Sequence, residues 1–148
     1  MKLDGKVVVV TGAGRGIGRE IALTCAQEGG SLVLAARSVE ALGETADEIE
    51  AAGGQAQVVQ TDVSDPEAAA FLASQALSRW GRVDALVNNS GIGGPSAPLW
   101  EVQPEDWEQT FAVNVTGVFL CCRALLPSMI EHQSGSIINI GSMTGKRP

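Results

Sequence analysis

One glycine-rich stretch, lying between a predicted strand and a predicted helix, constrains the fold of this chain more than any other feature. Residues 11–18 read Thr-Gly-Ala-Gly-Arg-Gly-Ile-Gly. The β-branched run at 6–10 predicts a buried strand, and residues 19–26 carry apolar side chains at helical spacing. Glycine has no Cβ and a helix N-terminus presents free N–H groups, so an anion can approach this backbone closely. The pattern favours the pyrophosphate of a dinucleotide as that anion.

The spacing of the glycines excludes two common phosphate-binding motifs. A P-loop needs a Lys followed by Ser or Thr directly after its last glycine, and Gly18 is followed by Arg-Glu instead. The Gly-x-Gly-x-x-Gly fingerprint also fails, because Ile17 occupies the place of its third glycine. The pattern present is Gly-x-x-x-Gly-x-Gly, formed by Gly12, Gly16 and Gly18. A nucleoside triphosphatase is therefore not expected.

This pattern resembles the first turn of the short-chain dehydrogenase/reductase family, Thr-Gly-x-x-x-Gly-Ile-Gly, and the resemblance extends over residues 6–148. It implies an NAD(P)-dependent oxidoreductase that transfers hydride between NADPH and a small-molecule carbonyl or alcohol substrate. The cofactor-binding residues that it implies in this turn are Gly12, Arg15, Gly16, Ile17 and Gly18.

Strand and helix patterns alternate along the chain, which predicts an α/β fold. The predicted strands cover residues 6–10, 31–36, 55–61, 83–87 and 135–140. The predicted helices lie between them, the last a long one that begins at Pro104. Right-handed crossovers between parallel strands then give a Rossmann-type doubly wound sheet with the order 3-2-1-4-5. We expect residues 1–148 to form one NAD(P)-binding domain that is incomplete at its C-terminus when set against the family.

Two arginines flank the expected adenosine pocket. Arg37 directly follows the second predicted strand, where NAD-preferring folds carry an acidic residue for the ribose 2′-hydroxyl. An arginine at this place suits the 2′-phosphate of NADP, and Arg15 adds a second cation within the glycine turn. Each could instead be a solvated surface charge. Taken together, they favour NADP over NAD as the cofactor.

Two further strand ends match segments that contact the cofactor in the resembled family. Asp62 and Val63 follow the third predicted strand, where the resemblance implies contacts to the adenine. Residues 88–91 follow the fourth strand and are similar to the family's Asn-Asn-Ala-Gly, with Ser90 in place of Ala. The resemblance implies that Asn89 backs the cofactor ribose and braces the sheet. An ordinary strand-end turn is the alternative for either segment.

The long predicted helix carries an apolar stripe and one polar residue beside it. Apolar residues recur at steps of three and four and predict the buried face: Phe111, Val115, Val118, Cys122, Leu125 and Met129. Asn114 borders this face, so its amide needs hydrogen-bond partners. The resemblance implies that Asn114 holds a water in the proton relay, and that dimers often form through this helix. A core asparagine with satisfied bonds is the alternative.

A serine follows the fifth predicted strand at the edge of the sheet where such folds bind ligands. Ser142 occupies the place of the family's catalytic serine, which comes after an Ile-x-Asn-Ile run. Ser136 begins the same strand and is therefore expected at the opposite edge. A simple strand-end cap is the alternative for Ser142.

Composition disfavours several other classes of function. The net charge of −7 and the sequence pI near 4.6 disfavour nucleic acid as a partner. The three cysteines and the single His132 have no metal-ligand spacing, so no metal site is expected. The first residues lack the apolar core of a signal peptide, and no apolar run approaches the ~18 residues of a membrane span. These features favour a cytoplasmic protein without a membrane partner.

The chain contains no tyrosine. In the resembled family a Tyr and, four residues later, a Lys follow the serine; the Tyr exchanges a proton with the substrate oxygen and the Lys lowers its pKa. We therefore expect these 148 residues to be the first part of a longer enzyme, inactive alone and prone to self-association at the uncovered fifth strand. The longer protein is expected to be a homo-oligomer, a dimer or tetramer. A non-catalytic dinucleotide-binding or interaction module is the alternative.

Overall fold

The sheet has the predicted strand order. In the computed structural model, which describes residues 1–142, five parallel strands lie in the order β3-β2-β1-β4-β5. They are β1 (Val7–Thr11), β2 (Ser31–Ala36), β3 (Gln55–Gln60), β4 (Ala85–Asn88) and β5 (Ser136–Asn139). Their bounds differ from the predicted ones by one or two residues at most. The Rossmann-type α/β fold is thereby confirmed.

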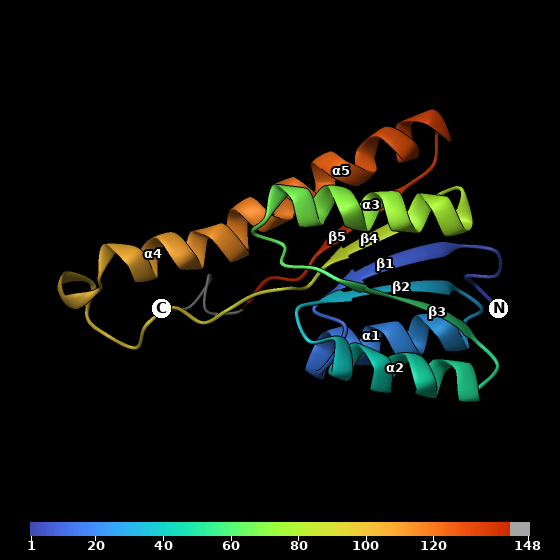
Figure 1. The fold of residues 1–148 in the computed structure, drawn as a ribbon, viewed down its shortest axis with the longest axis horizontal. Helices are drawn as coiled ribbons and strands as arrows, with labels where there is room; N and C mark the ends of the chain where they lie inside the picture. Colours follow the sequence, from blue (N-terminus) through green and yellow to red (C-terminus); the bar gives the residue numbers. More distant parts are fainter. Residues whose placement is uncertain (143–148) are drawn as a thin grey trace.

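Helices cover both faces of the sheet, as Figure 1 shows. α1 (Gly16–Gln27) and α2 (Val39–Ala51) lie on one face, and α3 (Pro66–Trp80) and α5 (Gly117–Glu131) lie on the other. Asp65 caps the start of α3: its Oδ1 accepts a hydrogen bond from the backbone N–H two residues later, at 2.9 Å. The fold therefore has three layers, with the sheet in the middle.

The side chains of β1, the central strand, alternate between two hydrophobic cores. Val7 and Val9 pack in the core under α3 and α5, whereas Val8 and Val10 pack in the core under α1 and α2. All four side chains are at most 4% exposed. Because both faces of this strand are buried, its sequence is an uninterrupted run of valines rather than an alternation of apolar and polar residues.

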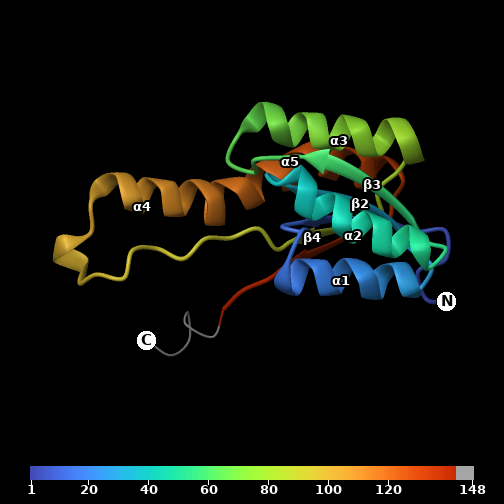
Figure 2. The ribbon, with the colours of Figure 1, turned by 60° about the horizontal axis from the view of Figure 1, so that its bottom comes forward.

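The long predicted helix is present, but two of the six residues on its predicted buried face are exposed. α4 (Pro104–Phe111), a π-helical turn η2 (Ala112–Thr116) and α5 follow one another without a break. Phe111 and Val115 keep 44% and 53% of their surface exposed, so their predicted burial is wrong. α4 projects beyond the sheet in Figures 1 and 2, and the wider π turn changes which side of the helix faces the sheet. The buried apolar residues of the helix are Val113, Leu120, Cys121, Leu125 and Met129.

The same helix, Pro104–Glu131, is the one within residues 1–142 that is long and apolar enough to cross a membrane, with a mean hydropathy of 1.6. This differs from the prediction, which looked for an uninterrupted apolar run. The mean hydropathy of an 18-residue segment can be high even when polar residues interrupt the run. The core helix of a soluble protein passes the same test, and α5 packs against α3 and β4. The finding is therefore weak support for a membrane location.

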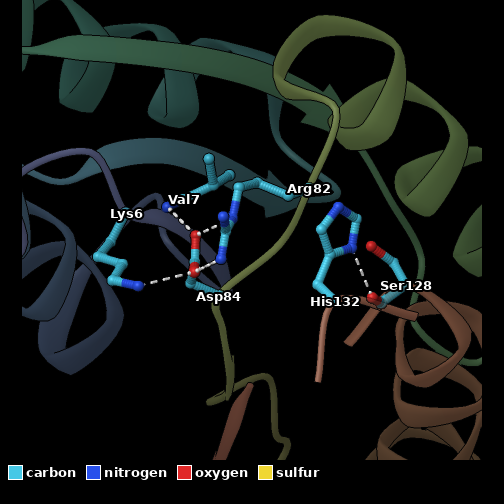
Figure 3. A network of polar contacts seen from close by, with 6 residues as sticks. All are labelled: Lys6, Val7, Arg82, Asp84, Ser128 and His132. Carbon is cyan, nitrogen blue, oxygen red and sulfur yellow. Dashed lines mark hydrogen bonds and ion pairs between the residues drawn. The ribbon is translucent and has the colours of Figure 1, made fainter. Parts of the chain in front are cut away.

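A buried carboxylate ties β1 to β4 at the amino ends of the strands (Figure 3). Asp84 accepts hydrogen bonds from Val7 N at 3.0 Å, from Lys6 Nζ at 3.2 Å, and from Arg82 Nε and Nη2 at 3.1 and 2.6 Å. Burial would raise the pKa of Asp84, but these hydrogen bonds and the Arg82 charge outweigh it, so the pKa lies below its ordinary value. The ionised carboxylate of Asp84 therefore links two neighbouring strands.

Candidate functional site

A cleft of about 670 Å³ opens at the carboxyl ends of the strands. It lies between the glycine turn, which joins β1 to α1, and the segments that follow β2, β3 and β4. Parallel α/β sheets bind ligands at this edge. The predicted cofactor-binding residues that line it are Gly12, Arg15, Gly16, Ile17, Arg37, Asp62, Val63 and Asn89. Gly18 is the predicted residue that does not line the cleft, because it is buried behind the turn.

The glycine turn depends on the absence of side chains. Gly12 and Gly16 have φ angles of +66° and +54°, a region that residues with a Cβ rarely adopt. A Cβ on Gly18 would lie 2.2 Å from the carbonyl oxygen of Gly12 and 2.4 Å from Asn89 Nδ2. Because Gly18 has no side chain, α1 can begin directly behind the turn, with its first residues in the cleft lining.

α1 begins without a side-chain cap, unlike its neighbours. Its N-cap residue, Arg15, makes no side-chain capping bond, and its first turn contains no acidic residue. α2 and α3 are capped by Ser38 and Asp65, and each carries a Glu in its first turn. Side chains therefore leave the first N–H groups and the positive dipole end of α1 unoccupied, which suits a bound pyrophosphate.

The hydroxyl of Thr11 joins the glycine turn to the end of β4. Thr11 Oγ1 accepts hydrogen bonds from the backbone N–H groups of Asn89 and Ser90, each at 3.0 Å. Asn89 Nδ2 in turn donates to the carbonyl oxygens of Thr11, at 3.0 Å, and Gly12, at 3.3 Å. Asn89 thus reaches the cleft while its amide holds the turn in place, so the segments after β1 and β4 form one rigid wall.

A second hydroxyl supports the turn from α2. Thr45 is fully buried, and its Oγ1 lies 3.2 Å from the carbonyl oxygen of Ala13 and 3.1 Å from that of Ala41. Sequence analysis did not single out Thr11 or Thr45. The sequence does contain a signal for Thr11, which is a hydroxyl residue at the end of a buried strand and directly before the first glycine. It contains none for Thr45, because the carbonyl group of Ala13 that it supports lies 32 residues away.

The charged residues that line the cleft are two arginines, Arg15 and Arg37, and one carboxylate, Asp62. Within residues 1–142 neither Arg15 nor Arg37 forms an ion pair. Asp62 Oδ1 accepts hydrogen bonds from the Ser64 hydroxyl at 2.6 Å and from the Ser64 backbone N–H at 3.0 Å. These two bonds, and to a smaller extent the Arg37 charge, hold the pKa of Asp62 below its ordinary value. The carboxylate is therefore ionised at neutral pH, and its Oδ2 accepts no hydrogen bond from the described residues.

Asn114 lies in the π turn and fastens the loop that follows β4. Its Oδ1 accepts from the backbone N–H of Ile92 and its Nδ2 donates to the carbonyl oxygen of the same residue, both at 2.9 Å. Both polar atoms of the amide are thus satisfied, as the alternative expected, but the residue is exposed and does not lie in the core. Asn114 does not line the cleft itself, but Ile92 does. π-helical turns occur frequently at functional sites.

Ser142 lies beyond the end of β5, on the carboxyl side of the sheet. The backbone N–H of Ile140 still donates to the carbonyl oxygen of Asn88, so the ladder between β4 and β5 continues past the last assigned strand residue. Ser142 is exposed and is not part of the cleft lining. Ser136 begins β5, at the opposite edge, as predicted.

The described residues contain no group of three or more His, Cys, Asp or Glu side chains that could hold a metal ion. Burial raises the pKa of Cys25, and burial together with the neighbouring Cys122 raises the pKa of Cys121 to about 11. These two thiols are therefore protonated at neutral pH. His132 ends α5, with Nδ1 2.8 Å from the carbonyl oxygen of Ser128 (Figure 3).

Known proteins share this fold and much of this sequence. A family model described as short chain dehydrogenase matches residues 6–148. An uncharacterized oxidoreductase of Listeria monocytogenes is 41% identical over 145 residues, which are 98% of this chain and 58% of the relative. The crystal structure of a metagenomic short-chain oxidoreductase in complex with NADP is 44% identical, with a TM-score of 0.95; the match covers 100% of this chain and 67% of that one. The structure of a 7α-hydroxysteroid dehydrogenase complexed with NADH and 7-oxo glycochenodeoxycholic acid is 37% identical, with a TM-score of 0.95; the match covers 99% of this chain and 57% of that one.

Proposed function

The chain belongs to the short-chain dehydrogenase/reductase family, and we propose that it binds NADPH in the cleft at the carboxyl ends of β1 to β4. In the whole protein, bound NADPH would supply hydride to a small-molecule carbonyl, or NADP would take hydride from an alcohol. The observation that carries the proposal is the pair of arginines, Arg15 and Arg37, that line the cleft without an ion-pair partner within residues 1–142.

The residues of the cleft fit a dinucleotide segment by segment. The uncapped start of α1 and the bare turn at Gly12 and Gly16 would hold the pyrophosphate. Asp62 would accept a hydrogen bond from the adenine amino group, because it is ionised and its Oδ2 accepts no bond from the described residues. Asn89 would lie behind a ribose of the cofactor. Gly18 would act indirectly, by letting α1 approach the turn.

The choice between NADPH and NADH does not follow from family membership. Of two similar solved structures, one contains NADP and the other NADH. The cofactors differ only by the 2′-phosphate of the adenosine ribose. Arg37 stands where NAD-preferring folds carry an acidic residue, and a guanidinium pairs well with a phosphate. The two arginines therefore favour NADPH.

Replacing Arg37 by aspartate is expected to weaken NADPH binding about 10- to 100-fold, since hydrogen bonds to charged groups contribute roughly 1.5–3 kcal/mol. NADH affinity should stay the same or improve, because NADH has no 2′-phosphate for the aspartate to repel. The dissociation constants can be measured by the fluorescence of the reduced nicotinamide. Lys2→Asp, an equal change of charge at the amino edge of the sheet, should leave both constants unchanged. Equal affinity of the unmodified chain for both cofactors would contradict the preference.

We further propose roles for the two residues at the rim of the sheet. Ser142 would donate a hydrogen bond to the substrate oxygen, and Asn114 would support the proton relay by holding the loop at Ile92 against the π turn. The tyrosine that exchanges the proton in the family has no counterpart, because this chain contains none, and the chain spans 58% of the length of its curated relative. We therefore propose that residues 1–148 bind cofactor but do not complete the reaction alone.

Replacing Ser142 by alanine in the full-length protein should lower kcat about 10- to 100-fold and leave the dissociation constant of NADPH unchanged. An interaction made chiefly in the transition state changes turnover more than ground-state binding. NADPH oxidation against a panel of carbonyl compounds measures the first quantity. Ser136→Ala, at the amino edge of the same strand, is the matched control. A Ser142→Ala variant with normal turnover would remove this serine from the site.

The remaining features of the proposal concern the whole protein. We propose a cytoplasmic homo-oligomer, a dimer or tetramer, that acts on small molecules rather than on nucleic acid. The net charge of −7 supports the exclusion of nucleic acid. A full-length protein that binds NADPH yet oxidises it with no carbonyl compound would instead favour the non-catalytic nucleotide-binding module.

A further inference from the structure

We propose that Gln60, at the end of β3, is a positioning residue for the discrimination between NADPH and NADH. Its side-chain amide holds the main chain of Arg37, the residue that would pair with the 2′-phosphate. The inference rests on the proposed preference for NADPH and extends it to a residue that does not line the cleft.

Gln60 extends the ladder between β2 and β3 by one residue. The last paired positions of the two strands are Ala36 and Gln60, and the backbone N–H of Thr61 donates to the carbonyl oxygen of Ala36 at 2.9 Å. Beyond this point the chains part, since Arg37 leads into α2 and Thr61 leads toward α3. Gln60 Nε2 then donates to the carbonyl oxygen of Arg37 at 3.0 Å. The side chain therefore supplies the bond that the backbone ladder no longer provides.

Arg37 is thus held from both sides. On its N-terminal side the ladder fixes Ala36, and on its C-terminal side Ser38 caps α2, accepting from Ala41 N at 3.3 Å. Within residues 1–142, the bond from Gln60 is the side-chain hydrogen bond that Arg37 itself accepts. The guanidinium forms no ion pair with those residues, so its position depends strongly on the main chain from which it extends.

Such a restraint affects one cofactor more than the other. A long, flexible side chain binds a phosphate more tightly when its main chain is already fixed, because less conformational freedom is lost on binding. NADH presents no phosphate to Arg37, so its affinity does not depend on where that guanidinium lies. A loosened cleft would weaken both cofactors, whereas a misplaced Arg37 weakens NADPH alone.

The side chain of Gln60 is exposed on β3, an edge strand of the described sheet, so its removal opens no cavity in the core. Gln60→Leu keeps the approximate volume and removes the donor. Gln55→Leu, at the other end of the same strand and likewise exposed, is the matched control. Gln55 makes no side-chain hydrogen bond within residues 1–142. Gln55→Leu therefore makes the same replacement of an exposed glutamine by leucine without breaking a hydrogen bond.

The experiment measures the dissociation constants of NADPH and NADH for the full-length protein and for both variants. Gln60→Leu should raise the NADPH constant about 3- to 10-fold, the range expected for one hydrogen bond, and leave the NADH constant within about twofold. Gln55→Leu should change neither. In an Arg37→Ala background, Gln60→Leu should not change the NADPH dissociation constant further. Both substitutions act through the contact between the Arg37 guanidinium and the 2′-phosphate, which Arg37→Ala has already removed.

Three outcomes would overturn the inference in distinguishable ways. In the first outcome, the protein prefers NADPH and Arg37→Asp removes that preference, but Gln60→Leu leaves the NADPH constant unchanged. This refutes the role of Gln60 and leaves the proposed function standing. An equal rise of both constants shows that Gln60 supports the cleft in general and does not position Arg37. A protein that shows no preference for NADPH before any substitution contradicts the proposed function, and the inference with it.

Discussion

Replacing Gly18 by alanine is expected to abolish binding of both NADPH and NADH and to destabilise the fold. The added Cβ would lie 2.2 Å from the carbonyl oxygen of Gly12, 2.8 Å from its carbonyl carbon and 2.4 Å from Asn89 Nδ2. Two of these three atoms belong to the backbone of the turn, which cannot swing aside as a long side chain can. Relief requires α1 to move away from the turn, and that movement separates the helix N-terminus from the pyrophosphate site.

The cost of this substitution should exceed that of ordinary overpacking, which is roughly 1–3 kcal/mol. The displaced turn also carries the two bonds from Asn89 Nδ2 to the carbonyl oxygens of Thr11 and Gly12. Cofactor titration should therefore show at least a 100-fold loss for both nucleotides, and thermal unfolding should shift to lower temperature.

Gly43→Ala is the matched control for Gly18→Ala. Gly43 lies inside α2, and a Cβ there would meet no heavy atom within 4 Å. Because alanine favours the helix interior over glycine by about 0.8–1.0 kcal/mol, this variant should be more stable than the parent and bind cofactor normally. A Gly18→Ala variant with unchanged affinity would show that the close approach of α1 to the turn is not needed for binding.

Replacing Asp84 by asparagine is expected to destabilise the chain by about 2–4 kcal/mol at neutral pH, since it removes the buried carboxylate that two partly exposed cations share. The carboxylate accepts from Lys6, Arg82 and the backbone of Val7, and its side chain is 6% exposed (Figure 3). Lys6 and Arg82 are 45% and 37% exposed, so water can solvate them afterwards, which keeps the loss below that of a fully enclosed pair.

The pH dependence follows from the lowered pKa of Asp84. The carboxyl binds its proton more readily in the unfolded chain, where its pKa is about 3.9, than in the folded one. Its contribution is therefore fully present above the unfolded pKa and is lost as the pH falls through the folded pKa. The difference in stability between the parent and the Asp84→Asn variant should shrink below about pH 4. Denaturant titrations between pH 3 and pH 7 measure this difference.

Two comparisons separate this effect from others. Glu20→Gln removes an exposed carboxylate that pairs with Arg19, and should change stability by less than about 0.5 kcal/mol, as surface ion pairs do. Asp84 lies at the amino ends of the strands, away from the cleft, so the folded Asp84→Asn variant should bind NADPH normally. A loss of stability that is the same at pH 3 and pH 7 would show that the charge of Asp84 is not what stabilises the fold.

The sequence alone determined the sheet and the location of the cleft. Short runs such as Val7–Val10 encode buried strands through their β-branched apolar residues, and right-handed crossovers leave few ways to order them. Glycines at fixed spacing between a strand and a helix predict a turn open to an anion. These signals are local, because each depends on residues within one turn of a helix or a few positions along a strand.

Only the tertiary structure decided which atoms meet across the ends of the strands. The hydrogen bonds between Thr11 and Asn89, between Gln60 and Arg37 and between Asn114 and Ile92 join residues 78, 23 and 22 positions apart. Each pairing depends on where its segments lie in the folded chain, which no local periodicity specifies. The exposure of Phe111 and Val115 has the same origin: their spacing marks a helix face, but whether a sheet lies beneath that face depends on how far the helix extends past it.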